Sequence, residues 1–176
     1  MMKNNSSKKN FKSGFVSIIG RPNVGKSTLM NSLVGEKIAI MSDKPQTTRN
    51  QIRAIYNDDE MQIVFMDTPG IHKPKHLLGE HMTNVALDTL NNSDLILFML
   101  DGTQEISTGD IFVNENARNS STPIVLVINK IDKMTDDEIS LKLEEVNQKL
   151  GDFEAIITMT GEYGIGVHKI FDICDK

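Results

Sequence analysis

The chain has 176 residues, which suits one compact domain with its own hydrophobic core. Its 39% apolar and 24% charged residues are ordinary for a globular protein, and its formal net charge of −5 argues against a domain that grips a nucleic-acid backbone by itself. The single cysteine, Cys174, excludes an internal disulfide and fits a reducing, cytosolic location, while no apolar run reaches the length of a membrane span.

The first 14 residues are polar and rich in lysine, and they lack the apolar stretch of a secretory signal. We expect a disordered tail over residues 1–14 and one folded domain over residues 15–176. An arm attracted to a membrane surface or to RNA is the alternative interpretation of the tail.

Strands and helices are expected to alternate along the domain. In chain order the sequence predicts a strand at 15–19, a helix at 26–34, a long loop at 36–50, a strand hairpin at 51–56 and 61–67, a helix at about 77–90, a strand at 94–100, a helix at 106–119, a strand at 122–128, a helix at 136–150, a strand at 155–159 and a last helix at 167–174. The predicted apolar helix faces are Leu29, Met30 and Leu33, then Leu78, Met82, Val85, Ala86 and Leu90, then Ile139, Leu143, Val146 and Leu150. This alternation predicts an α/β sheet with helices on both faces, whose ligands bind beyond the carboxyl ends of the strands.

The first chemical motif runs from Gly20 to Ser27 and matches GxxxxGKS between a predicted strand and a predicted helix. Backbone N–H groups of such a loop cradle phosphates, and the helix N-terminus adds positive dipole. Lys26 is expected to reach the β- and γ-phosphates, and the Ser27 hydroxyl to ligate Mg²⁺. The candidate nucleotide-binding residues of this loop are Gly20, Arg21, Pro22, Asn23, Val24, Gly25, Lys26, Ser27 and Thr28. A plain strand–turn–helix connection is the alternative.

The second motif, Asp67-Thr68-Pro69-Gly70, follows the strand predicted at 61–67. Asp67 is expected to hold Mg²⁺ through a water, because this ion keeps several waters in its octahedron. Gly70 leaves its N–H able to approach the γ-phosphate. Taken alone, the motif would be an ordinary Pro-Gly turn.

The third motif is Asn129-Lys130-Ile131-Asp132, directly after another apolar strand. Guanine presents two adjacent donors, which one carboxylate can accept, whereas adenine lacks that pair. Asp132 therefore predicts selection of GTP and GDP. Asn129 is expected to tie this loop to the base edge and the phosphate loop, and the Lys130 stem to cover the base plane. A lone motif of this kind is more often a solvated charged loop.

In this order, the three motifs resemble those of the translation-factor-type P-loop GTPases, and the chain is most similar to their Era family. The similarity runs from Phe15 to about Phe171 and includes the segment Pro45 to Arg49 and the Gly-Ile-His-Lys-Pro run from Gly70 to Pro74. The resemblance implies a six-stranded, mostly parallel sheet with one antiparallel strand. It also implies that Thr48 ligates Mg²⁺ and senses the γ-phosphate, with its neighbour Thr47 as the alternative. The first switch would span residues 36–50 and the second residues 68–79, and the catalytic group would be Lys26, Thr48, Asp67 and Gly70.

Two positions bear on the rate of hydrolysis. Ile71 stands where many GTPases carry a water-orienting glutamine, so we expect slow basal turnover, on the order of 10⁻² s⁻¹ or lower. Asn23 matches an asparagine associated with K⁺ in relatives. A K⁺ site there and a loop asparagine that only stabilises a turn both remain open.

The last nucleotide-binding segment also departs from the family, because Thr160-Gly161 replaces its Ser-Ala pair. The backbone contact to the guanine oxygen does not need a side chain, so we keep Thr160 and Gly161 as candidates. The glycine-rich residues that follow put base affinity in doubt.

Era-like proteins continue into a C-terminal KH-type RNA-binding domain, and no RNA-clamping segment of that domain appears in these 176 residues. We expect a truncated chain, with loss of the domain in the lineage as the alternative. The resemblance implies a monomer that acts in assembly of the 30S ribosomal subunit, contacts small-subunit ribosomal RNA through the missing domain, and is cytoplasmic with peripheral contact at the inner face of the membrane.

Three other functions are weighed against a hydrolysing switch. One is a GTP-dependent binding module with negligible hydrolysis, which Ile71 keeps open. Another is a G domain of the Der or tRNA-modification type. The third is a phosphotransferase or other P-loop ATP enzyme, against which Asp132 argues.

Overall fold

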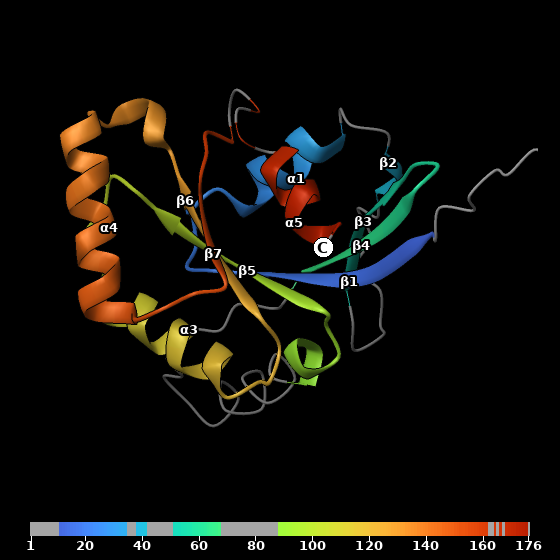
Figure 1. Cartoon of the computed structure of the whole chain (residues 1–176), viewed down its shortest axis with the longest axis horizontal. Coiled ribbons are helices and arrows are strands. Elements are labelled where there is room, and N and C mark those ends of the chain that lie inside the picture. Colours follow the sequence, from blue (N-terminus) through green and yellow to red (C-terminus); the bar gives the residue numbers. More distant parts are fainter. Residues whose placement is uncertain are drawn as a thin grey trace, which may run out of the picture.

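The computed structural model describes residues 11–34, 38–41, 51–67, 88–161, 164, 166 and 168–175. They form one seven-stranded sheet in the order β2-β3-β4-β1-β5-β6-β7, with helices on both faces (Figure 1). The strands are β1 (Lys12–Ile19), β2 (Ile38–Met41), β3 (Gln51–Asn57), β4 (Met61–Asp67), β5 (Leu95–Asp101), β6 (Ile124–Asn129) and β7 (Ala155–Thr158). The helices are α1 (Lys26–Val34), α3 (Thr108–Arg118), α4 (Asp136–Leu150) and α5 (His168–Cys174), and a 3-10 turn η1 (Ile131–Lys133) precedes α4.

Among the described strands, only β3 runs against the others. It pairs antiparallel with both β2 and β4, whereas β4, β1, β5, β6 and β7 pair in parallel. The predicted fold class is confirmed, and all six predicted strands are present. A further edge strand, β2, lies inside the stretch predicted to be a loop, because its apolar Ile-Ala-Ile-Met run is short and set among polar residues.

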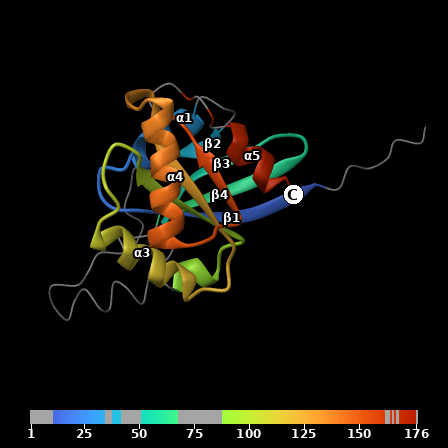
Figure 2. The ribbon, with the colours of Figure 1, turned by 60° about the vertical axis from the view of Figure 1, so that its left-hand side comes forward.

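Both faces of the sheet are buried, which explains the near-continuous apolar runs of its central strands. On one face, α1 and α5 pack through Leu29, Leu33 and Ile170. On the other face, α3 and α4 pack through Val113 and Val146. Figure 2, turned by 60° from Figure 1, keeps α1 and α5 on one side of the strands and α3 on the other. The carboxyl ends of the parallel strands therefore lie together at one edge of the sheet, and helices cover both of its faces.

The helix ends follow local sequence signals. α1 and α4 have the bounds that the sequence predicts. Thr135 caps α4 in a capping box with Glu138, and Gly151 ends it with φ 78°. α3 begins at Thr108, two residues later than predicted, because Ser107 caps it in a second capping box.

The predicted apolar face of α4 is partly wrong. Val146 and Leu150 are buried, but Leu143 is 36% exposed. Lys142 is buried instead, with 8% of its surface exposed. Its ammonium donates to the Gln104 carbonyl oxygen at 2.7 Å, so a paired cation occupies a position that the apolar pattern did not mark.

Two further predictions concern residues at the ends of described segments. β1 begins at Lys12, within the stretch predicted as a tail. Of the helix predicted at 77–90, only the end at residues 88–91 is described, and Leu90 there is buried.

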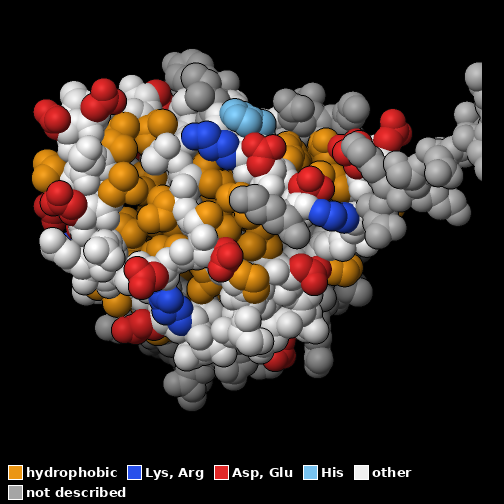
Figure 3. Space-filling model, in the orientation of Figure 1, with side chains coloured by type: hydrophobic (Ala, Val, Ile, Leu, Met, Phe, Trp, Pro, Cys, Tyr) orange, Lys and Arg blue, Asp and Glu red, His pale blue; other side chains and the backbone are white. Residues whose placement is uncertain are grey.

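Apolar side chains reach the surface on the face that carries α4 and α5 (Figure 3), and Ile156 of the edge strand β7 is 44% exposed. Among the helices described, none is long and apolar enough to cross a bilayer.

Candidate functional site

In the loop between β1 and α1, two glycine positions leave no room for a side chain. Gly20, Asn23 and Gly25 have positive φ angles of 145°, 64° and 105°. A Cβ on Gly20 would lie 2.5 Å from the Met99 carbonyl oxygen, and one on Gly25 would lie 2.1 Å from Nδ2 of Asn129. The two glycines of the motif are therefore needed for close approach to β5 and β6.

Lys26, the first residue of α1, folds back over this loop. Its ammonium donates to the carbonyl oxygens of Gly20 and Arg21, at 2.7 Å each. The cation is thus held against the loop, at the N-terminal end of a helix whose dipole also favours anions. Ser27 and Thr28 are exposed in the same first turn.

Arg21 is anchored to α3. Its Nε lies 2.7 Å from Oδ1 of Asp110, whose side chain is only 2% exposed. The other carboxylate oxygen of Asp110 accepts from the N–H and the hydroxyl of Ser107. The start of α3 therefore fixes the side chain of one phosphate-loop residue, a contact that the sequence motifs did not reveal.

Asp67 is the last residue of β4, beside β1. In the parallel pairing of these strands it is in register with Ile18, two residues before the phosphate loop begins. Ser27 and Asp67 thus belong to elements that meet at one edge of the sheet. Their hydroxyl and carboxylate oxygens are the donor types that Mg²⁺ prefers, so this pair of residues fits the ion. The candidates Thr48, Thr68, Pro69, Gly70 and Ile71 lie outside the described residues.

Asn129 joins three loops. It ends β6 and is 2% exposed. Its Nδ2 donates to the Val24 carbonyl oxygen at 2.9 Å, and its Oδ1 accepts from the Gly161 N–H at 2.8 Å. One buried amide therefore connects the phosphate loop, its own loop and the last nucleotide-binding segment, using a donor and an acceptor at once.

The residues after Asn129 turn sharply. Lys130 has φ 66°, and η1 follows it, with Ile131 half-buried and Asp132 exposed. The Lys130 ammonium donates to the Asn23 carbonyl oxygen at 3.1 Å and to Oδ2 of Asp101 at 2.6 Å. Its side chain thus spans the gap between this loop and the phosphate loop.

The last segment, Thr160-Gly161, lies against the same cluster. The Gly161 carbonyl oxygen accepts from the Ser32 hydroxyl of α1. A Cβ on Gly161 would be 3.4 Å from Oδ1 of Asn129 and 3.5 Å from Cγ2 of Thr28, both ordinary contacts. The Thr160 hydroxyl is buried and has no partner among the described residues. The described surroundings of Gly161 therefore leave room for an alanine side chain at this position.

Sequence reasoning missed Asp101 and Asp110. Asp101 ends a buried apolar strand, as Asp67 and Asn129 do, and this shared position was the signal that could have found it. Asp110 carried no such signal, because an acidic residue near a helix start is common.

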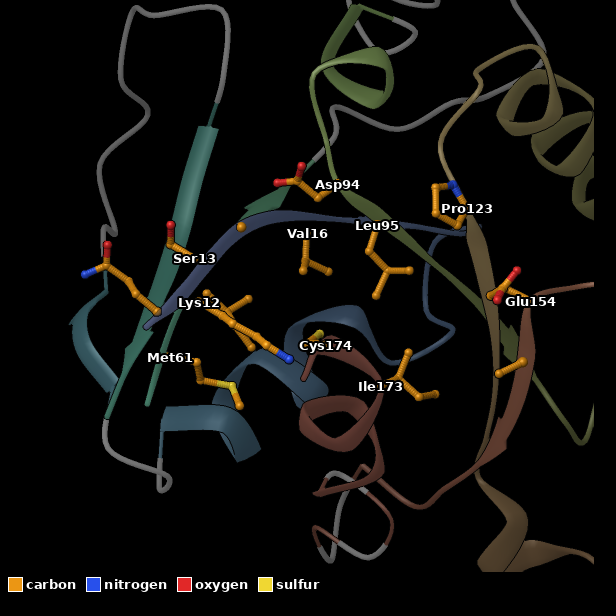
Figure 4. Close-up of a pocket in the computed structure, with 14 residues that line it drawn as sticks. Lys12, Ser13, Val16, Met61, Asp94, Leu95, Pro123, Glu154, Ile173 and Cys174 are labelled. Carbon is orange, nitrogen blue, oxygen red and sulfur yellow. The ribbon is translucent and has the colours of Figure 1, made fainter. Parts of the chain in front are cut away.

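A cavity of about 430 Å³ lies at the opposite edge of the sheet. It is lined by the first residues of several strands, among them Lys12, Met61 and Leu95. Figure 4 shows Ile173 and Cys174 of α5 facing this side of the sheet. Because the chemical motifs follow the carboxyl ends of β1, β4 and β6, this cavity is separate from the candidate site.

Comparison with known proteins begins with the sequence family. Residues 15–130 match the family described as 50S ribosome-binding GTPase. A protein named GTPase Era from Alkaliphilus metalliredigens is 55% identical over 157 residues, which cover 89% of this chain and 53% of the relative. GTPase Era from Clostridioides difficile is 56% identical over 154 residues, covering 88% and 52%. The chain spans about half the length of these curated relatives.

Solved structures agree with this assignment. Era in complex with MgGDPNP and nucleotides 1506–1542 of 16S ribosomal RNA matches with a TM-score of 0.77 and 36% identity, covering 94% of this chain and 57% of that one. Aquifex aeolicus Era bound to GDP·AlF4⁻ gives a TM-score of 0.76, 36% identity and coverage of 94% and 56%. The G domain of the T. maritima FeoB iron transporter, at 19% identity and a TM-score of 0.62, covering 92% and 96%, shares the fold. The chain belongs to the 50S ribosome-binding GTPase family and is an Era-like GTPase domain.

Proposed function

We propose that this domain binds GTP with Mg²⁺, hydrolyses it to GDP and phosphate, and acts as the switch of an Era-like ribosome-assembly protein. The observation that carries the proposal is the Asn129 side chain, which bonds both to the phosphate loop and to Gly161. A contact of this kind makes phosphate binding and base binding depend on one another.

Phosphate binding is assigned to the loop from Gly20 to Gly25 and to the start of α1. The positive φ angles of this loop suit a backbone that wraps an anion. The Lys26 ammonium lies against the same loop, where it donates to the Gly20 carbonyl oxygen. Nucleotide contacts are proposed for Arg21, Pro22, Asn23, Val24, Lys26, Ser27 and Thr28, and for Thr68, Pro69, Gly70 and Ile71 after β4.

Magnesium is proposed to bind to Ser27 and Thr48, and to Asp67 through a water. When bound, the ion supplies positive charge that stabilises the phosphate oxygens as the γ-phosphate leaves. Lys26 contributes fixed positive charge from the protein, and Gly70 a backbone N–H. A second cation, K⁺, is proposed beside Asn23. Equal turnover in KCl and NaCl would exclude it.

Base selection is assigned to Asp132, which is exposed on η1 and so open to a ligand. Its two carboxylate oxygens can accept from both donors on the guanine edge. Asn129, Lys130, Ile131, Thr160 and Gly161 complete the base site. An adenine would leave the Asp132 carboxylate without the two donors that guanine supplies, which predicts discrimination of about 100-fold or more.

Turnover is proposed to be slow. Ile71 cannot orient water as a glutamine does, so positioning and electrostatics supply most of the acceleration. A GTP-dependent binding module without useful hydrolysis is the second candidate, and the same Ile71 favours it.

The biological setting is proposed from the relatives. The family description names the 50S subunit, whereas one solved Era complex contains a 16S ribosomal RNA fragment. We favour small-subunit RNA and 30S assembly, because the Era protein in that complex is 36% identical to this chain and the match covers 94% of this chain. RNA contact would be made by the part of the relatives that this chain does not span. A monomeric, cytoplasmic protein with peripheral membrane contact completes the proposal.

The test is phosphate release from GTP by the purified domain with Mg²⁺, measured beside Lys26→Ala. Removal of the ammonium takes away charge that both the nucleotide and the transition state need, so the variant should be at background. Wild-type release above that background supports the hydrolysing switch. Wild-type GTP binding with release no faster than the variant would favour the binding module.

A further inference from the structure

Among the described residues, the Lys130 ammonium has one charged partner and one neutral partner. Oδ2 of Asp101 lies 2.6 Å away, and the Asn23 carbonyl oxygen lies 3.1 Å away. The Asp101 side chain is 10% exposed and that of Lys130 is 30% exposed, so water screens this pair only in part. Lysine is a flexible side chain with a large rotamer entropy, and a single neutral acceptor would hold it weakly.

Thr103 orients the Asp101 carboxylate. Oδ1 of Asp101 accepts from the Thr103 N–H at 3.0 Å and from its hydroxyl at 2.6 Å. Burial acts to raise the pKa of Asp101, but the hydrogen bonds from Lys130 and Thr103 outweigh it and lower that pKa. One oxygen is therefore occupied by the turn, which leaves the other aimed at Lys130.

The backbone around Asp101 is fixed to the same residue that connects the loops. Asp101 is in register with Asn129 in the pairing of β5 and β6. The Gly102 N–H donates to the Asn129 carbonyl oxygen at 2.9 Å. A Cβ on Gly102 would lie 2.5 Å from Sδ of Met134 and 3.0 Å from that carbonyl oxygen, so the turn is packed closely. The backbone that carries the Asp101 carboxylate is therefore held against the base loop.

We propose that Asp101, oriented by Thr103, is a positioning residue that fixes the Lys130 side chain between the base loop and the phosphate loop and thereby slows release of guanine nucleotide. The inference rests on the proposed function and deepens it. Asp101 acts through Lys130, which would lie along the base plane, so it affects how long a purine stays bound. It does not choose the base, because Asp132 makes the edge contacts.

The test follows dissociation of a fluorescent GDP analogue from the full chain by stopped flow. Asp101→Asn replaces an ion pair with a hydrogen bond from the Lys130 ammonium to a neutral amide, and it should speed dissociation about tenfold. Thr103→Val should give a smaller increase, and Thr103→Ser should restore the wild-type rate. The ratio of GTP to ITP affinity should not change, since it depends on the exocyclic amine that Asp132 accepts from.

A double-mutant cycle with Lys130→Met separates positioning from general destabilisation. If Asp101 acts through Lys130, Asp101→Asn should have almost no further effect on dissociation in the Lys130→Met background. Glu145→Gln is the matched control, because it neutralises another lysine-paired carboxylate outside the nucleotide motifs. It should lower the melting temperature and leave dissociation unchanged.

Three outcomes distinguish the ideas. Wild-type protein that does not bind GDP would overturn the proposed function itself. Wild-type binding with unchanged dissociation from Asp101→Asn would overturn only the positioning role. Additive effects of Asp101→Asn and Lys130→Met would also overturn it, since they would show that Asp101 acts by another route.

Discussion

Nδ2 of Asn129 donates to the Val24 carbonyl oxygen at 2.9 Å, across 105 residues of sequence. The bond is buried, and it crosses from the end of β6 to the loop that follows β1. These strands are not neighbours, because β5 lies between them. The Asn129 amide therefore connects the proposed base site directly to the proposed phosphate site.

Removing this amide should weaken nucleotide binding as well as stability. Asn129→Ala leaves the Val24 carbonyl and the Gly161 N–H without their partner. We expect a loss of about 2 kcal/mol or more in the free energy of unfolding, and GDP affinity should fall at least tenfold.

The control is Asn114→Ala. Asn114 is also buried, and its Nδ2 donates to the Leu150 carbonyl oxygen, outside the nucleotide motifs. Calorimetry and GDP titration should show a lower melting temperature for both variants but weaker binding only for Asn129→Ala. Equal losses of affinity would contradict the special role of Asn129.

Two glycines beside Asn129 should respond differently to alanine. Gly25 has φ 105°, and its Cβ would lie 2.1 Å from Nδ2 of Asn129. Gly161→Ala would make only contacts of 3.4 Å and longer. We expect Gly25→Ala to weaken GDP binding about tenfold or more, since backbone strain adds to the clash.

Gly161→Ala should bind GDP as the wild type does. It should also gain about 0.5 kcal/mol in stability, because alanine has less freedom in the unfolded chain. Isothermal titration and thermal unfolding measure both effects. A Gly161→Ala protein that loses binding would show that the last segment is arranged differently around the nucleotide.

The ion pairs of α4 predict a pH dependence. Burial acts to raise the pKa of Glu145, but hydrogen bonds from Lys142, Lys149 and the Ile106 N–H outweigh it and lower that pKa from 4.5 to about 2. The charged carboxylate therefore stabilises the fold above pH 4.5, and this contribution is lost as the pH falls towards 2. Glu145→Gln should destabilise the domain by about 1–2 kcal/mol at pH 7, a value reduced by partial exposure to water.

Denaturant unfolding at pH 7 and at pH 2.5 tests this. The difference in the free energy of unfolding between wild type and Glu145→Gln should be smaller at the lower pH. A difference that stays constant would mean that the carboxylate charge contributes nothing.

The Cys174 thiol should react slowly with alkylating reagents in the folded protein. Burial raises the pKa of its thiol from 9.0 to about 11. The neutral thiol in the folded state is favoured, so its contribution to stability is complete below pH 9 and is lost as the pH rises towards 11. Iodoacetamide at pH 9 should label the native protein much more slowly than the urea-unfolded protein. Equal rates would show that α5 does not shield the thiol.

The sequence predicted the fold and the bond from Asn129 to the phosphate loop for identifiable reasons. Glycine spacing and apolar runs marked the phosphate loop and the central strands, and the amide of Asn129 could be assigned its bond to the phosphate loop from chemistry alone. β2 was missed because four apolar residues pair only in the presence of β3. Lys142 was missed because its burial depends on Glu145 and on a carbonyl 38 residues away in the chain.

Asp101 shows the limit most clearly. Its position at the end of β5 could be read from the sequence, but its role depends on the distance to Lys130, which only the packed sheet defines. Side chains whose partners come from distant elements cannot be assigned by periodicity, since periodicity reports which face of an element is buried and not what lies opposite.

The central claim is that this domain is built for guanine nucleotides, and a direct competition between GTP and ATP tests it. The affinity of the purified chain with Mg²⁺ should be at least about 100-fold higher for GTP than for ATP. Asp132→Asn should remove this preference, because an amide cannot accept both guanine donors. ATP binding as tight as GTP binding in the wild type would contradict the account.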